Sequence, residues 1–164
     1  MRGLLLITTA AAALMCGGPA PAQQQVVPPA PPAYGAPISL EQAKTAITAA
    51  QAESKKNGWN HVFAVVDGGG NLIAFEKSDL ASNASVTIAQ AKAKMAATYR
   101  VATKAYQDRL AAGETFVLGL PGAIPAAGGV PIVVGGKIIG AIGVSGATPL
   151  QDQQSAVAGT EAVK

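Results

Sequence analysis

The chain has 164 residues, a formal net charge of +3 at pH 7 and a charged fraction of only 13%, and its basic residues are spread along its length. Without a Lys/Arg block, the composition gives no support to nucleic-acid binding. The one cysteine, Cys16, lies near the start, so residues beyond it hold no thiol for a disulfide framework or a cysteine zinc site.

Residues 1–22 have the pattern of a cleavable signal peptide. Arg2 supplies the positive start, an apolar run follows over residues 4–15, and residues 20–22 have the small-x-small pattern that signal peptidase cuts. The run falls short of the ~20 residues that a membrane-spanning helix needs, and Met15 before Cys16 does not fit a lipidation signal. We expect export to the periplasm or the extracellular space, with loss of Cys16.

Residues 23–38 are rich in Pro, Ala and Gln, which favours extended polyproline conformations and predicts a flexible linker. The remaining residues, 39–164, are enough for one domain. Ser39 and Gln42 fit a capping box, and apolar residues at helical spacing predict a helix from there to about Asn57, with Gly58 as its stop.

Two β-hairpins and further helices follow. Residues 61–66 and 72–75 are β-prone on either side of a glycine-rich turn, and residues 130–134 and 138–144 repeat the pattern. Helices are predicted from about residue 83 to 102, over 104–112, and after Pro149, with a long loop over 114–129. The order αββααββα predicts an α/β (α+β) domain with an antiparallel sheet of about five strands covered by helices.

Several motifs in register resemble the GlcG/HbpS-like family, also known as the haem-degrading, DUF336 or PduO C-terminal-like domain. The motifs are GGVPIV at 128–133, GKIIGAIGVSG at 136–146, Asp152, VVD and GNL at 65–72, AF at 74–75 with Asp79 and Ala81, and small residues around Lys92 at 88–96. The similarity spans about residues 40–164. The chain departs from the family pattern at Lys77, where Arg is usual, and at Leu80, where Gly is usual.

The resemblance implies a profilin-like sandwich that forms a homo-oligomer and binds haem or a related tetrapyrrole. In some exported relatives the domain sequesters haem or senses redox state beside a membrane sensor. These properties, including haem as a cofactor and a membrane sensor as a partner, are expectations from the family.

Candidate ligand-binding residues come from four regions. Glycine backbone N–H groups can approach an anion closely, and lysine and tyrosine can hold a carboxylate or stack on a ring. The same residues also suit tight turns, a helix surface and core packing. The candidates are Lys92, Tyr99, Lys77, Gly128, Gly129, Ser145 and Gly146.

His61 is the only histidine and is therefore the one strong neutral haem-iron ligand in the sequence, although a histidine at the start of a strand is more often a partly exposed surface residue. Asp67 and Asp152 are candidates for an acid/base pair, or for a turn and a helix start respectively. A protein zinc site would need three or four clustered ligands, so no metal site is predicted.

Three functions fit these residues. The first is an exported binding protein for haem or a related tetrapyrrole. The second is an enzyme such as a lyase, isomerase or hydrolase of an organic acid, using Lys92, Asp67 and the glycine-loop N–H groups; the lack of a second histidine counts against it. The third is a purely structural oligomerisation module.

Overall fold

The computed structural model describes residues 29–164, so the predicted signal peptide and the first part of the predicted linker lie outside the described residues. The elements in chain order are α1 (Leu40–Lys56), β1 (Val62–Asp67), β2 (Leu72–Lys77), α2 (Ala84–Tyr99), α3 (Thr103–Ala111), the 3-10 helix η1 (Thr115–Gly119), β3 (Gly129–Val134), β4 (Lys137–Ser145) and α4 (Pro149–Glu161). Within residues 29–164, none of the helices combines the length and the apolar character needed to cross a bilayer.

The α/β class and the antiparallel sheet agree with the sequence-based expectation, but the strand count and the order need correction. The sheet has four strands, not five, in the order β2-β1-β4-β3 with every pair antiparallel. The two hairpins supply all four strands. Part of the predicted loop 114–129 forms η1, which the predicted order of elements lacks.

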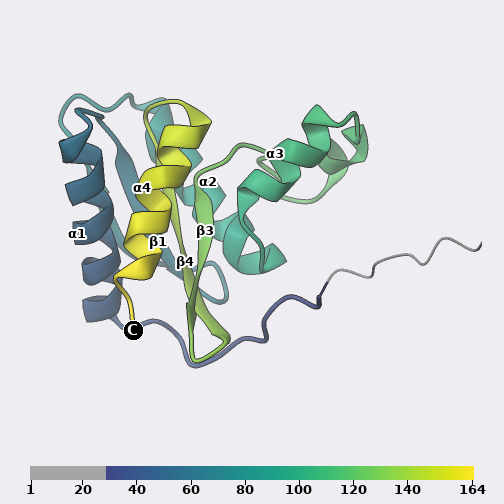
Figure 1. Ribbon diagram of the computed structural model, residues 1–164, viewed down its shortest axis with the longest axis horizontal. Helices are drawn as coiled ribbons and strands as arrows, with labels where there is room; N and C mark the ends of the chain where they lie inside the picture. Colours follow the sequence, from purple (N-terminus) through teal and green to yellow (C-terminus); the bar gives the residue numbers. More distant parts are fainter. Residues whose placement is uncertain (1–28) are drawn as a thin grey trace, which may run out of the picture.

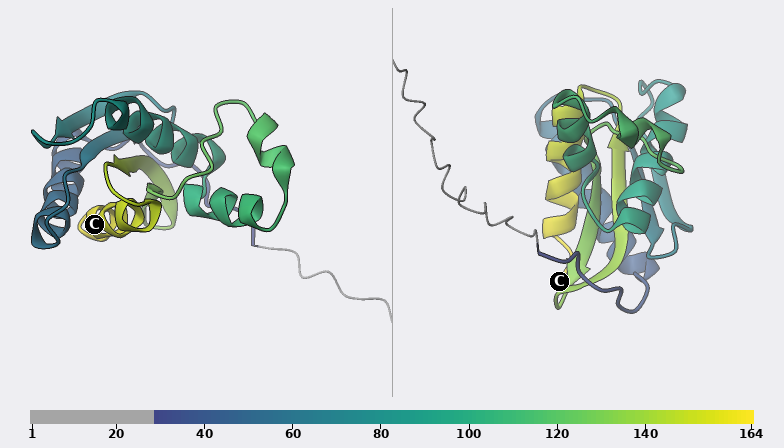
Figure 2. Two further views of the ribbon diagram at one scale, coloured as in Figure 1. Left: turned by 90° about the horizontal axis from the view of Figure 1, so that it is seen from above. Right: turned by 90° about the vertical axis from the view of Figure 1, so that its right-hand side faces the viewer.

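Helices cover both faces of the sheet (Figures 1 and 2). Helices α1 and α4 pack together on one face, and α2 packs on the other against β4, β1 and β3. Helix α3 and η1 project beyond the sheet and make few contacts with it. The predicted capping box opens α1, because Ser39 Oγ accepts from the Gln42 backbone N–H and the Gln42 side chain accepts from the Ser39 backbone N–H.

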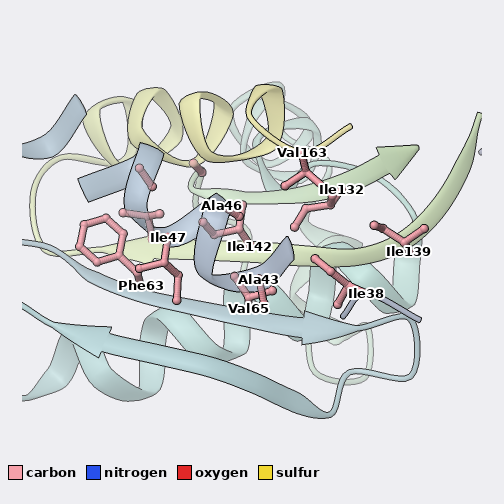
Figure 3. Close-up of a cluster of buried hydrophobic side chains, with 13 residues drawn as sticks. Ile38, Ala43, Ala46, Ile47, Phe63, Val65, Ile132, Ile139, Ile142 and Val163 are labelled. Carbon is pink, nitrogen blue, oxygen red and sulfur yellow. The ribbon is translucent and has the colours of Figure 1, made fainter. Parts of the chain in front are cut away.

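Strand β1 is buried on both faces because helices cover both. Phe63 and Val65 point into the core cluster beneath α1 and α4, which Figure 3 shows, whereas Val62, Ala64 and Val66 point into the cluster beneath α2. This alternation follows from the two-residue period of a strand. It explains why the sequence of β1 reads as a continuous apolar run.

Helix α2 lies very close to the sheet because small residues face each other. A Cβ added at Gly143 of β4 would collide with the carbonyl oxygen of Ala89 and would lie 2.5 Å from the backbone nitrogen of Ala93. Ala89 and Ala93 are fully buried. Helix α2 can therefore approach β4 this closely only because position 143 is glycine.

The prediction of a flexible linker over 23–38 needs correction at residues 33–38, which pack against the domain. Strand β1 pairs with β4 only as far as Gly140, which leaves the edge of β4 free at Ile138 and Ile139. The extended segment hydrogen-bonds there, and Tyr34 forms a parallel bridge with Ile138. Ile38 is buried, and Tyr34 Oη donates to the Ala97 carbonyl at 2.8 Å. Burial of Ile38 and the hydrogen bond from the half-exposed Tyr34 hold the segment against the domain.

The contact between α2 and Gly143 gives a stability test. We expect Gly143→Ala to lower the free energy of unfolding by about 3 kcal/mol, because the added methyl must displace helix backbone rather than a flexible side chain. Urea denaturation of the purified protein measures the change. Gly119→Ala is the control, since Gly119 is exposed and its added Cβ meets nothing within 4 Å. Equal stability of the two variants would contradict the close packing.

Candidate functional site

A buried cluster of charged and polar groups lies where β1 begins, β4 ends and α4 begins. Lys92 Nζ is 2.7 Å from Asp152 Oδ2 and donates a second hydrogen bond to the Val144 carbonyl at 3.1 Å. His61 Nε2 lies 3.2 Å from Asp152 Oδ1. His61 is completely buried, and Lys92 and Asp152 are each only 2% exposed. One carboxylate thus joins a lysine and a histidine that come from different elements.

Local structure positions each member of this cluster. Thr148 and Gln151 form a capping box that starts α4, which places Asp152 in its first turn. There Asp152 Oδ1 accepts from the Ala147 backbone N–H at 3.0 Å, and a carboxylate at this end of a helix is favoured by the helix dipole. Lys92 lies on the face of α2 that packs on β4, so its aliphatic stem is covered by the sheet.

Two serine hydroxyls complete the surroundings of His61. Its Nδ1 lies 2.9 Å from Ser54 Oγ and 3.3 Å from Ser155 Oγ. Ser54 donates its hydroxyl proton to the Trp59 carbonyl, so toward His61 it acts as an acceptor. On the other side, Nε2 contacts Asp152 but is not aligned for a hydrogen bond.

Serine, histidine and aspartate are the residue types of a hydrolytic triad. The arrangement of Ser54, His61 and Asp152 nevertheless indicates a structural role. The Ser54 residue is only 2% exposed, and its proton is already donated to a backbone carbonyl. Backbone N–H groups next to it, such as that of Trp59, are used within the helix end. A nucleophile needs an exposed oxygen and a base to take its proton.

Burial lowers the pKa of Lys92 from its usual value, while the hydrogen bond and the charge of Asp152 act in the opposite direction. Desolvation has the larger effect because the ammonium has left water almost completely. The pair therefore stabilises the fold only while both members are present, since either charge alone would be buried without a partner.

The glycine loop covers this cluster instead of offering its N–H groups to a ligand. Gly128 N–H donates to Gln153 Oε1 at 3.0 Å, and Gly129 N–H donates to Thr103 Oγ1 at 2.9 Å. A Cβ at Gly128 would lie 2.9 Å from Lys92 Nζ. The predicted use of these N–H groups as an anion site is therefore wrong for this conformation, because internal acceptors already occupy them.

Ser145 and Gly146 lie at the same end of the sheet. Ser145 is buried at the end of β4, and a Cβ at Gly146 would lie 2.9 Å from the Cα of His61. The φ of Gly146 is 149°, in the region that favours glycine. Gly146 thus permits the close approach of two chain segments beside the buried cluster.

A pocket of about 390 Å³, which we call the Trp59 pocket, opens beside this cluster at the end of α1. Ser54 lines this pocket and also contacts His61 Nδ1. The aromatic rings of Trp59 and His61 are 5.6 Å apart between centroids. The lining residues are Gln51, Ser54, Lys55, Gly58, Trp59, Asn60, Phe63 and Ser78.

A second pocket of about 360 Å³, the Tyr99 pocket, lies on the other side of the sheet between α2 and the turn at Pro121 and Gly122. Tyr99 Oη donates to the Pro121 carbonyl at 2.8 Å, and its ring packs edge-on against Tyr106. Tyr99 is the sequence-predicted ligand residue that lines this pocket. The lining residues are Ala91, Lys94, Met95, Thr98, Tyr99, Pro121 and Gly122.

Asp67 lies at the opposite end of β1 from His61, about 20 Å away along an extended strand. Its carboxylate accepts from the backbone N–H groups of Gly69 and Asn71, each at 2.9 Å, and so fixes the hairpin turn. The structure therefore does not join Asp67 with Asp152 as an acid/base pair, nor with Lys92 as the enzyme hypothesis requires.

Two further candidates have simple surroundings. Lys77 Nζ reaches the carbonyl oxygens of Ser78 and Asp79, at 3.3 and 3.4 Å, and does not line either pocket. His61, expected to be partly exposed, is buried, with Ser54 of α1 and Ser155 of α4 both against its ring. Within residues 29–164, no three His, Cys, Asp or Glu side chains lie close enough together to hold a metal ion.

Sequence reasoning missed Ser54, Ser155, Trp59 and Lys94. Ser54 and Ser155 lie on helices far apart in the chain, so no local spacing pairs them with His61. The sequence could have indicated the Trp59 pocket, because its one tryptophan follows a predicted helix end and tryptophan is enriched at binding hot spots.

The family described as "Haem degrading protein HbpS-like" matches residues 38–161, more than half of the chain. The chain belongs to the HbpS-like family. The match confirms the resemblance seen in the glycine-rich motifs and around Lys92. Protein GlcG of Escherichia coli is 42% identical over 108 residues, which cover 66% of this chain and 81% of GlcG.

Solved structures of similar proteins have the same fold. A double mutant of HbpS from Streptomyces reticuli has a TM-score of 0.73 and 29% identity, over 92% of this chain and 99% of that one. PduOC, solved as a haem complex, has a TM-score of 0.70 over 78% of this chain and 96% of that one. At 22% identity, PduOC shares the fold alone.

The Lys92–Asp152 pair gives the second stability test. We expect Lys92→Met to lower the free energy of unfolding by about 3–5 kcal/mol, because it leaves Asp152 charged and buried. The double variant Lys92→Met/Asp152→Asn is expected to regain part of this loss, since no unpaired charge remains. Urea denaturation measures all three proteins.

The matched control for that test is Lys104→Met, which removes an exposed ion pair with Asp108 on α3. Exposed pairs contribute about 0.2–1 kcal/mol. A loss in Lys92→Met no larger than in Lys104→Met, or a double variant less stable than Lys92→Met, would contradict the assigned role of the pair.

Asp67 gives a test of pH dependence. Hydrogen bonds from the Asn71 side chain and then its backbone lower the pKa of Asp67 from its usual 3.8. A carboxyl pKa that is lower in the folded than in the unfolded protein increases the free energy of unfolding. This contribution is fully present above pH 3.8 and is lost as the pH falls through the folded-state pKa of Asp67. We expect Asp67→Asn to cost about 1–2 kcal/mol at pH 7, and the difference from wild type to narrow below pH 3.8. Urea denaturation from pH 7 to pH 3 measures it; a constant difference would contradict this account.

Proposed function

We propose that this HbpS-like protein is exported and binds haem or a related tetrapyrrole in the Tyr99 pocket. The observation that carries the proposal is the chemistry of that pocket. Apolar side chains of α2 form one wall, a proline forms the other, and a phenol and an ammonium stand at its edge. Ligand pockets are mostly apolar with a few placed polar groups.

The residues present fit the parts of a tetrapyrrole. Ala91 and Pro121 offer apolar surface to a flat ring, and Lys94 makes no ion pair within residues 29–164, so it can receive a propionate. Tyr99 is the oxygen donor of the pocket, and tyrosine is one of the side chains that hold haem iron in proteins. At about 360 Å³ the pocket is at the small end for ligand sites, about 300–1,000 Å³, so one edge of the ring would extend into solvent.

His61 has no role as an iron ligand in this proposal. Both ring nitrogens face groups of the buried cluster, and the side chain has no exposed surface. To bind iron it would have to leave Ser54 and Asp152, and so give up its contacts with both groups inside the core. Tyr99 requires a smaller change, because it gives up one hydrogen bond to the Pro121 carbonyl.

The family supports this proposal through its description as haem-degrading and through PduOC, which shows that the fold can hold haem. Export rests on the pattern of residues 1–22. We also propose a homo-oligomer, because Phe116 and Leu118 are 52% and 61% exposed on the projecting η1 segment. Such apolar surface is usual where copies of a chain meet.

A hemin titration of residues 23–164 tests the function. We expect a saturable change of the Soret band at micromolar hemin, and we expect Tyr99→Phe to shift the band because the phenol oxygen is lost while the ring is retained. Lys94→Gln is expected to weaken binding about tenfold, since it removes a charge-assisted hydrogen bond.

Tyr106→Phe and His61→Gln are the controls for this titration. Tyr106 packs on Tyr99 but does not line the pocket, so its variant should keep the wild-type spectrum. The absence of a saturable Soret change would overturn haem binding. If His61→Gln altered the spectrum and Tyr99→Phe did not, the iron would be bound outside the Tyr99 pocket, which would contradict the proposed site.

A further inference from the structure

The Trp59 pocket is separate from the proposed tetrapyrrole site. It opens at the end of α1, on the face of the sheet opposite to α2, and it shares no residue with the Tyr99 pocket. Its volume of about 390 Å³ is enough for a small organic molecule. A ligand could therefore occupy it whether or not the Tyr99 pocket binds haem.

Three polar side chains around the Trp59 pocket have no hydrogen-bond or ion-pair partner within residues 29–164. Lys55 contributes an ammonium, Asn60 an amide and Ser78 a hydroxyl. The neighbouring Lys56 differs, since its ammonium lies 3.8 Å from Glu53. A cation together with neutral hydrogen-bond donors is the set of groups that receives a carboxylate.

The apolar part of the pocket is held in place by the buried cluster. Phe63 is fully buried in the core, and the Trp59 backbone is fixed by its N–H bond to the Ser54 carbonyl and by the Ser54 hydroxyl on its own carbonyl. Ser54 is in turn held by His61. An aromatic wall that is already ordered loses little entropy when a flat ligand packs against it.

The charge of the pocket lining favours a ligand with a single negative charge. Lys55 is the one lining cation of the pocket, and the side-chain amide of the lining residue Gln51 donates to the carboxylate of Glu76, which does not itself line the pocket. A dianion such as phosphate would have only one ammonium to balance it, whereas a monocarboxylate matches the ammonium.

We propose that the Trp59 pocket binds a small monocarboxylate with a flat apolar body, with Lys55, Asn60 and Ser78 on the carboxylate and Trp59 on the body. This activity goes beyond tetrapyrrole binding and stands independently of it. Ser54, which lines the pocket, contacts His61, and His61 contacts Asp152, so the pocket adjoins the buried cluster.

Titration with benzoate tests this site directly, because Trp59 is the only tryptophan of the chain and its fluorescence reports this pocket alone. We expect a saturable change in emission with benzoate, and weaker binding of benzamide, which has the same ring without the charge. Lys55→Gln should raise the dissociation constant about tenfold. The matched control is Lys56→Gln, which should leave it unchanged because Lys56 does not line the pocket.

An ¹⁵N correlation spectrum during the same titration locates the ligand. The expected shifts fall on the Trp59 indole and on the Asn60 and Ser78 backbone amides. The proposal is overturned if millimolar benzoate gives no saturable change, if Lys55→Gln and Lys56→Gln bind equally, or if inorganic phosphate binds as tightly as benzoate. Hemin binding through the Tyr99 pocket can be present or absent in each case, so the two proposals fail separately.

Discussion

The Lys92–Asp152 ion pair is the interaction on which the arrangement of this domain depends. Lys92 comes from α2 on one face of the sheet and Asp152 from α4 on the other side, and they meet past the end of β4 at 2.7 Å. Because both groups are almost completely removed from water, they tolerate neither separation nor the loss of one partner. The pair thus links α2 to α4 beside the end of β4.

The glycines around the pair follow from the same constraint. Gly128 allows the loop before β3 to cover the Lys92 ammonium, and Gly143 allows α2 to come close enough for that ammonium to reach the Val144 carbonyl. Gly146 lets the chain turn past His61 toward α4. Glycine motifs of the HbpS-like family that resemble a ligand loop thus serve, in this chain, to enclose a buried charge.

The two pockets differ in their relation to this core. The Tyr99 pocket lies beside the projecting α3 and η1 segment, where contacts with the rest of the domain are few. Segments with few contacts open at low cost, which suits the proposal that a large flat ligand binds there. The Trp59 pocket rests on Ser54 and the fully buried Phe63, so its shape is set before any ligand arrives. A rigid pocket of this size suits a smaller molecule.

Local chemistry in the sequence determined the elements: the capping box at Ser39, the two hairpins and the helix stop at Gly58 were all readable, because caps, turns and hydrophobic periodicity act over a few residues. The glycine-rich motifs and the residues around Lys92 also determined the family. The tertiary structure alone decided that His61 is buried, that Lys92 is paired with Asp152, and that residues 33–38 pack on β4. Each of these depends on residues far apart in the chain, and the desolvation that governs them exists only after the helices have closed over the sheet.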